Sequence, residues 1–308
     1  MVPDFPKFGP LPLESKADYE RLISEFPPFS DISFATLHIW WNLEGQLAIS
    51  LLNENLVINF ELASDDVNSG WCIIGKNKID ESIDTIFNYL AQNSKTVKLV
   101  HVPEFVVEKI NDRSVLNLEE ETDYNEYILD SNALSKLEGS IHGKNRRRIN
   151  KFLREVEGQK VEIKELDLSS QQVKNELMDA IVLWEEEKAG ENDPDHNERD
   201  AIKKALDHSK ELGMLQAGLY INDNLQAIIL YHQPHDKNYY ILNHIKVDYS
   251  TPYIFDYITH HVANKAAQEG VQYLNMEMDL GIEGLREHKM GLRPVNFFKK
   301  YTITPVNK

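Results

Sequence analysis

The stretch MLQAGLYINDNLQAIILYH, residues 214–232, holds two strand-like runs on either side of the turn residues 222–224. Runs rich in β-branched and aromatic residues that flank such a turn predict a β-hairpin. The run NYYILNHIKV, residues 238–247, predicts a third strand. A helical pattern follows at 254–267, and the compact run VQYLNME at 271–277 predicts a further strand. Antiparallel strands, then one helix before a parallel pair, indicate an α+β fold.

The first half of the chain repeats this order of elements. The runs QLAISLL and NLVINF, residues 46–60, predict a hairpin, and residues 71–74 predict a third strand. Residues 80–90 place their apolar side chains on one helical face, and TVKLVHV at 96–102 predicts a buried strand. This is the element order of the acetyltransferase-type (GNAT) fold. We therefore expect two consecutive GNAT-like domains, each a mixed, mostly antiparallel sheet flanked by helices.

Length and composition agree with a two-domain globular protein. The chain has 308 residues, against roughly 150 for an average domain. We predict domains at 1–135 and 136–308, with helix 142–155 as the connector. No run approaches the roughly 18 apolar residues of a spanning helix, and the N-terminus lacks a secretory pattern. The single Cys72 excludes an internal disulfide, so we expect a cytoplasmic protein that lacks a transmembrane segment.

The charge distribution sets one basic helix apart from an acidic chain. The formal net charge of −17 disfavours an extended nucleic-acid footprint. In HGKNRRRINKFLRE, residues 142–155, helical spacing brings Lys144, Arg147, Arg148 and Lys151 onto one face. Such a face suits phosphate, because Arg offers a planar fork of donors and Lys a point charge. The alternative is a solvated linker helix.

Polar residues also gather at the end of the predicted strand 271–277. On a strand, Asn275, Glu277 and Asp279 would alternate with two methionines and share one face. Glu277 is then a candidate general base, since burial raises the pKa of a carboxyl group. Arg286 and Lys289 follow on a short predicted helix and are candidates to pair with the carboxylates. The alternative is a purely structural group of salt bridges.

Other motifs carry less information. Glu198 is expected in the first turn of a helix that Asn197 caps, where a carboxylate is favoured by the helix dipole. The turn KVDYSTPYIFDY, residues 246–257, has no glycine before its helix; Ser250 and Thr251 are expected to cap that helix, with Pro252 at its first position. The histidines show no metal-ligand spacing, so we predict no metal site.

Four segments resemble the family related to the C-terminal domain of phosphatidylglycerol lysyltransferase. They are FPPFSDISF at 26–34, DYNEYILDSNALSKLEGSIHGKNRRRINKF at 123–152, NERDAIKKAL at 197–206 and NMEMDLGIEGLREHKMGLRP at 275–294. The last string is the most specific. The resemblance implies tandem GNAT-type folds and transfer of an aminoacyl group, typically from a charged tRNA, to an amine or hydroxyl acceptor.

The resemblance also implies a set of site residues. They are Lys144, Asn150, Phe152, Glu198, Lys246, Asp248, Glu277, Asp279, Glu283, Arg286 and Lys289. Two departures from the family pattern are visible: the basic motif lacks its usual histidine, and the glycine before the helix is replaced by Thr251-Pro252.

The leading hypothesis is an aminoacyl or acyl transferase with an aminoacyl-tRNA donor and a small-molecule or lipid-headgroup acceptor. Donor phosphates would meet Lys144, Arg147 and Lys246, supported by Asn150 and Asp248. Glu277 and Asp279 would position or deprotonate the acceptor, and Arg286 and Lys289 would stabilise the oxyanion, with Glu198 and Glu283 in support. The alternatives are an N-acetyltransferase using acyl-CoA, and a non-catalytic protein of this fold that binds an anionic metabolite.

Overall fold

The chain forms two compact units, and neither unit is one continuous segment. The computed structural model describes residues 2–41, 47–60, 70–94, 96–189 and 196–306. The first unit combines 1–126, 278–281 and 297–308, and the second combines 127–277 and 282–296. The predicted boundary after residue 135 would assign both C-terminal stretches of the first unit to the second domain. The division into domains at 1–135 and 136–308 stays a prediction.

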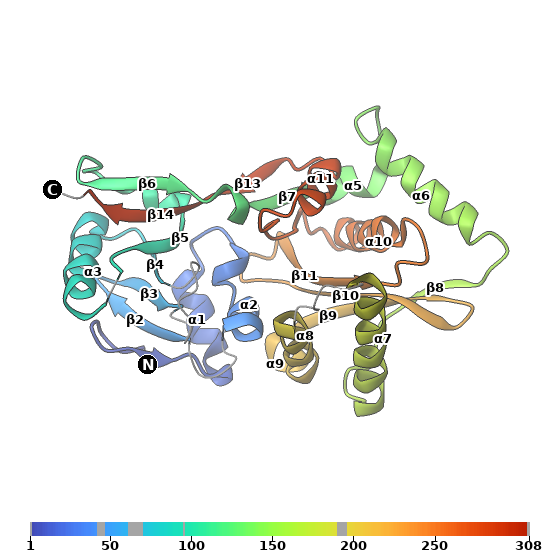
Figure 1. Ribbon diagram of the computed structural model, residues 1–308, viewed down its shortest axis with the longest axis horizontal. Coiled ribbons are helices and arrows are strands. Elements are labelled where there is room, and N and C mark those ends of the chain that lie inside the picture. Colours follow the sequence, from blue (N-terminus) through green and yellow to red (C-terminus); the bar gives the residue numbers. More distant parts are fainter. Residues whose placement is uncertain (1, 42–46, 61–69, 95, 190–195, 307–308) are drawn as a thin grey trace. The chain divides into compact units, whose positions relative to one another are not determined.

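The first unit is built on a seven-stranded sheet with the strand order β1-β2-β3-β4-β5-β14-β6 (Figure 1). Its strands are β1 (Gly9–Pro10), β2 (Ala48–Leu52), β3 (Asn55–Asn59), β4 (Trp71–Ile74), β5 (Leu99–Pro103), β6 (Leu116–Glu120) and β14 (Lys300–Pro305). Its helices are α1 (Lys16–Ile23), α2 (Phe34–Thr36), which continues as a π-helical turn at Leu37–Trp41, α3 (Ile79–Asn93) and α4 (Glu104–Val107).

The second unit is built on a second seven-stranded sheet with the order β13-β7-β12-β11-β10-β9-β8. The strands of this sheet are β7 (Glu126–Asp130), β8 (Val161–Lys164), β9 (Met214–Ile221), β10 (Asn224–His232), β11 (Tyr239–Val247), β12 (Tyr273–Asn275) and β13 (Asn296–Phe298). Glu126 of β7 and the last two residues of β13 are counted in the first unit. Its helices are α5 (Ser131–Lys136), α6 (Gly143–Glu155), α7 (Gln171–Ala189), α8 (His196–Asp207), α9 (Ser209–Leu212), α10 (Ile254–Glu269) and α11 (Glu283–Gly291). Figure 1 shows α10 on one side of this sheet and α8 and α9 on the other.

Both hairpins form where the turn residues predict them. Asn222 and Asp223 have φ angles of 50° and 64°, and Asn53 and Glu54 have 51° and 64°. Two successive residues at positive φ match the right-handed twist of the flanking strands, which is why two-residue hairpins favour this turn. The mixed, mostly antiparallel sheets flanked by helices confirm the predicted α+β fold class.

The parallel pair in each sheet is short. In the second unit β11 pairs with β12 only over Tyr239↔Tyr273 to Ile241↔Asn275. In the first unit β4 pairs with β5 at Trp71↔Leu99. Two residues after the last pair, each later strand turns through a positive φ, at Glu277 (56°) and at His101 (53°). The two units therefore repeat the same local divergence of two strands, although they share no sequence signature there.

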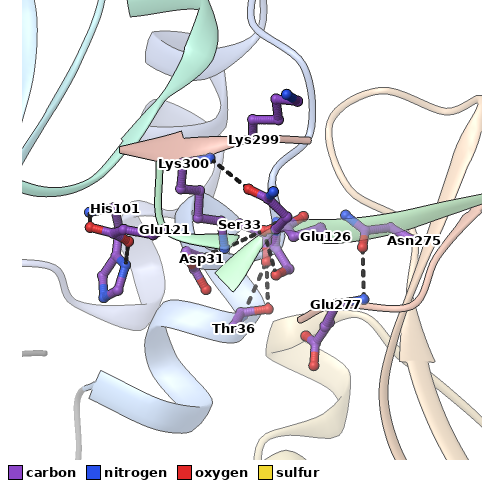
Figure 2. A network of polar contacts seen from close by, with 12 residues as sticks. Asp31, Ser33, Thr36, His101, Glu121, Glu126, Asn275, Glu277, Lys299 and Lys300 are labelled. Atoms are coloured by element: carbon purple, nitrogen blue, oxygen red, sulfur yellow. Dashed lines mark hydrogen bonds and ion pairs between the residues drawn. The ribbon is translucent and has the colours of Figure 1, made fainter. Parts of the chain in front are cut away.

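A buried lysine lies at the start of β14. Lys300 is fully buried, and its ammonium forms ion pairs with Asp31 and, at 2.8 Å, with Glu126 (Figure 2). The second Glu126 oxygen accepts a 2.8 Å hydrogen bond from the Ser30 amide. Burial lowers the pKa of Lys300, but the charges of Asp31 and Glu126 outweigh burial and hold the pKa above its ordinary value. The C-terminal strand is thus tied to the first unit by charge as well as by its ladder.

Replacing Lys300 by alanine should lower the free energy of unfolding of the first unit by about 3–5 kcal/mol, because two buried carboxylates lose their cation. The matched control is the neighbouring Lys299→Ala, since Lys299 is partly exposed and pairs with Glu120 at 3.2 Å. That surface pair should contribute little to the free energy of unfolding, because solvent screens exposed ion pairs. Urea denaturation of both variants measures the difference, and equal effects would contradict the buried-network account.

Candidate functional site

The candidate site lies in the second unit, where β12 leaves β11. Beyond Asn275 the chain follows β7 instead. The Met276 amide donates to the Tyr127 carbonyl at 2.9 Å, and the Tyr127 amide donates to the Glu277 carbonyl at 3.3 Å. β11 continues to Val247 without a further pair on β12. Side chains can therefore enter the space where the backbone ladder has stopped.

A side-chain hydrogen bond spans this divergence. The Asn243 amide nitrogen donates to Glu277 Oε1 at 2.9 Å. Asn243 is the extra residue of a β-bulge, because Leu230 pairs with His244 and Tyr231 pairs with Leu242. Bulges re-aim a side chain next to the interrupted ladder. Here the bulge directs Asn243 toward the strand that is leaving the sheet.

Glu277 is fixed through its backbone as well. Its amide donates to Asn275 Oδ1 at 2.8 Å (Figure 2), and its φ of 56° is a conformation that non-glycine residues rarely adopt. Glu277 is 9% exposed to solvent. A strained backbone at a buried ionisable group is a pattern of functional sites. The prediction of a regular strand face through Asn275, Glu277 and Asp279 is wrong, since β12 ends at Asn275 and the left-handed turn breaks the alternation.

Lys289 supports the divergent segment from helix α11. Its buried ammonium donates to the Met276 carbonyl at 2.6 Å and lies 5.8 Å from the centre of the Tyr127 ring. On the same helix Arg286 is half-buried and Glu283 is exposed. The structure thus brings Lys289 to the backbone beside Glu277.

Asp279 belongs to the first unit. It is fully buried, and its Oδ1 accepts a hydrogen bond from the Gly281 amide at 2.8 Å. Glu277 belongs to the second unit. The role predicted for Asp279 toward the acceptor stays a prediction.

A second polar group lies between β11 and the helices α7 and α8. Lys246 forms ion pairs with Glu185 at 2.8 Å and with Glu198 at 2.5 Å. Glu185 also accepts a 2.5 Å bond from the Arg199 Nε, and the His244 ring lies 3.7 Å from Glu198. Lys246 and Glu198, both predicted from the sequence, are brought together, whereas Glu185 was not predicted. The helix cap predicted at Asn197 lies outside the residues whose side chains are described.

The charges of this group are set by their mutual contacts. Burial raises the pKa of Glu198, but the nearby His244 and the charge of Lys246 outweigh burial and lower the pKa to about 2. Burial lowers the pKa of Lys246, but the charges of Glu198 and Glu185 raise it above its ordinary value. Burial lowers the pKa of His244 more than Glu198 raises it. Glu198 and Lys246 are therefore charged at neutral pH, and His244 is neutral.

The predicted basic helix exists as α6 and packs against α10. Phe152 is fully buried and stacks on Tyr257 with 4.3 Å between ring centres. Arg148 forms a 3.1 Å ion pair with Asp256, and Lys151 lies 3.4 Å from the Tyr253 hydroxyl. These contacts place α6 along the N-terminal half of α10.

The outer face of α6 is exposed. Lys144, Arg147 and Asn150, three of the five residues predicted for the donor, are all exposed on this helix. In a chain with a net charge of −17, an exposed basic helix face is a local feature that can attract an anion.

The loop before α10 differs from the predicted cap. The residue that precedes the helix is Tyr253, with a φ of 62° and no side-chain capping bond. Ser250 instead donates its amide to Asp248 Oδ1 at 2.8 Å, and the Thr251 hydroxyl donates to Gln226 at 3.1 Å. Pro252 precedes the capping position. The predicted caps are wrong because the left-handed Tyr253 precedes the helix, which therefore begins at Ile254, two residues later than the predicted first position at Pro252.

A family model described as phosphatidylglycerol lysyltransferase, C-terminal, matches residues 40–304. The chain belongs to this family. No curated protein matches the sequence significantly.

Solved structures support the same fold. A conserved protein of unknown function from Bacteroides thetaiotaomicron has a TM-score of 0.82 at 20% identity, covering 100% of both chains. L-PGS from Bacillus licheniformis has a TM-score of 0.64 at 14% identity, covering 100% of this chain and 94% of that chain. FemX has a TM-score of 0.56 at 8% identity, with 98% of each chain covered. The tandem GNAT-like fold expected for this family is confirmed.

The described residues were also compared with what a membrane-spanning helix and a metal site require. Every described helix is too short or too polar to cross a membrane. In the same parts of the chain, no three His, Cys, Asp or Glu side chains are grouped so that they could hold a metal ion.

The family motifs did not reveal Asn243, whose amide donates to Glu277. Asn243 lies inside the apolar strand run at 238–247. The adjacent polar residues Asn243 and His244 are the feature of the sequence that could have pointed to it. A buried polar side chain needs a partner, so such a pair points to a bonded network. The bulge that aims Asn243 depends on strand register, which a single sequence does not show.

Glu198→Gln should lower the unfolding free energy at pH 7 and flatten its decline in acid. Because the folded-state pKa of Glu198, about 2, lies below that of the unfolded chain, the carboxylate stabilises the fold above about pH 5, and this contribution is lost as the pH falls toward 2. The expected contribution is about 2–3 kcal/mol. Denaturation curves between pH 7 and pH 2 measure it. Glu157→Gln, at an exposed position after α6, is the control, and a decline as steep as the wild type in Glu198→Gln would refute the assignment.

Proposed function

We propose that the protein is an aminoacyltransferase that moves an aminoacyl group from a tRNA ester to an amine or hydroxyl acceptor. The observation that carries the proposal is Glu277: a buried carboxylate, held by Asn243 and Asn275, at the point where β11 and β12 separate. Family membership supports this class of reaction.

Glu277 has the properties that a general base needs. Its carboxylate accepts a hydrogen bond from Asn243, and its backbone amide donates one to Asn275. Positioned carboxylates accelerate proton transfer by about 10²–10⁴-fold. The acceptor gives its proton to Glu277 as its nitrogen or oxygen attacks the ester carbonyl. The C–O bond to the tRNA ribose then breaks, and the ribose oxygen leaves with the proton that Glu277 took up, which restores the carboxylate. The net change is one ester bond exchanged for one amide or ester bond.

Helix α11 supplies the positive charge in this scheme. Lys289 holds the Met276 carbonyl and so keeps the segment before Glu277 in place. Arg286, three residues earlier on the same helix, is assigned to the developing oxyanion, where a fixed cation is most effective. Glu283 is assigned to the support of the acceptor.

The donor side is assigned to helix α6. Lys144, Arg147 and Asn150 are exposed on one helix, as contacts to a phosphate backbone require. Asp248 holds the loop before α10 through the Ser250 amide. Lys246 already pairs with two carboxylates, so its proposed part is to fix α7 and α8 against β11 and to meet the donor only if those pairs open. The acceptor is a small molecule or a lipid headgroup.

Glu277→Gln should reduce transfer by about 10²–10⁴-fold with little change in melting temperature, because glutamine keeps the shape but cannot accept a proton. The assay follows labelled amino acid from bulk aminoacyl-tRNA into amines and phosphatidylglycerol vesicles. Glu287→Gln, an exposed position on α11, should keep wild-type activity. Unchanged transfer in Glu277→Gln would refute the role of Glu277 as general base. Transfer from acetyl-CoA alone would refute aminoacyl-tRNA as the donor.

The double variant Lys144→Ala/Arg147→Ala should weaken tRNA binding and reduce its salt dependence by a slope of about 2, since each phosphate contact contributes roughly 0.9. Lys203→Ala/Lys210→Ala removes the same charge from exposed positions elsewhere in the second unit and should leave the slope unchanged. Fluorescence anisotropy at 50–200 mM salt, on the order of physiological ionic strength, measures both. If tRNA binding had the same salt dependence in the two double variants, α6 would not be part of the donor site.

A further inference from the structure

We infer that His232 is a positioning residue for Glu277, acting through the side chain of Asn243. This inference rests on the proposed function, because it assumes that Glu277 receives the acceptor proton. The His232 Nδ1 lies 2.7 Å from Asn243 Oδ1, and Asn243 Nδ2 lies 2.9 Å from Glu277 Oε1. The three side chains thus form one continuous chain of hydrogen bonds.

The chemistry of the amide fixes the direction of this chain. An ionised Glu277 only accepts hydrogen bonds, so Asn243 must present its NH₂ group to it. The carbonyl oxygen of Asn243 then faces His232 and only accepts. His232 must therefore carry its proton on Nδ1. A reversed amide would place two acceptors against each other at Glu277, and the His232 proton is what opposes that reversal.

The bulge makes this arrangement possible. His232 is the last residue of β10 and pairs with Ile241, while Asn243 is the bulged residue between Leu242 and His244. A bulged residue can rotate its side chain out of the regular alternation of the strand. Without the bulge, the residues of β11 would alternate in the ordinary register and Asn243 would lose its direction toward Glu277.

Burial strengthens the effect of each bond. His232 is 3% exposed and Asn243 is 8% exposed, so bulk water competes little for either group. Hydrogen bonds in such surroundings polarise one another, and a chain of them holds its last member more firmly than a single bond does. Because the Asn243 N–H group is fixed at Glu277 Oε1, the carboxylate has its orientation before the acceptor substrate binds.

A double-variant cycle distinguishes a positioning role of His232 from a purely structural one. If His232 only fills space, its loss acts on stability and adds to the loss at Glu277. If it positions Glu277, its effect disappears once Glu277 no longer acts as a base. The experiment therefore compares a variant that keeps an N–H group at the position of His232 Nδ1 with a variant that removes this N–H group.

The experiment measures kcat and KM for aminoacyl transfer in His232→Leu, His232→Asn and Glu277→Gln, and in the double variant His232→Leu/Glu277→Gln. Asparagine places an N–H where the imidazole carries Nδ1–H, so His232→Asn should stay within about threefold of wild-type kcat. His232→Leu should lose about tenfold in kcat with little change in KM, as expected for one lost hydrogen bond to a working group. His261→Leu, a half-buried histidine of α10, is the control that should keep full activity.

The outcomes separate the inference from the function. A double variant no slower than Glu277→Gln supports positioning, whereas additive losses, or equal losses in His232→Leu and His232→Asn, overturn it. If Glu277→Gln transfers normally, the proposed function fails instead. Two-bond ¹H–¹⁵N spectra of histidine-labelled protein test the geometry without activity: a proton on Nδ1 of His232 is expected, and a ring protonated only on Nε2 would overturn the inference.

Discussion

The interruption of the β11–β12 ladder after Ile241 and Asn275 is the constraint on which the candidate site depends. Backbone donors and acceptors at that point need new partners. Met276 finds them in Tyr127 of β7 and in the Lys289 ammonium, and this re-pairing carries the chain away from β11. A buried carboxylate can then occupy the space that a continuous ladder would have filled.

Charge pairing organises the rest of the second unit around that opening. Lys246 and two carboxylates fasten α7 and α8 to β11, and Arg148 fastens α6 to α10 through Asp256. Desolvation opposes the attraction within buried ion pairs of this kind. Their consequence here is geometric: Lys246 holds α7 and α8 against β11, the strand that carries Asn243, and Arg148 holds α6 against α10.

The sequence predicted the parts of the molecule that follow from local patterns. The hairpins at Asn53-Glu54 and Asn222-Asp223, the helix at 254–267 and the basic helix α6 formed as expected, because turn chemistry and helical period are encoded in neighbouring residues. Three features were not predictable in this way. The end of β12 at Asn275, the bulge at Asn243 and the burial of Lys300 depend on contacts between residues far apart in the chain. Glu277 itself was found from its motif, while its supports His232 and Asn243 required the register of the sheet.

The most direct test of the account is a crystal structure with an aminoacyl-adenosine analogue whose reactive ester is replaced by an amide. The account predicts that the aminoacyl carbonyl lies beside the Asn243–Glu277 pair, leaving an acceptor atom room within about 3–3.5 Å of both the carbonyl carbon and the Glu277 carboxylate. Binding of the analogue at a place remote from Glu277, with the Asn243–Glu277 bond undisturbed, would contradict it.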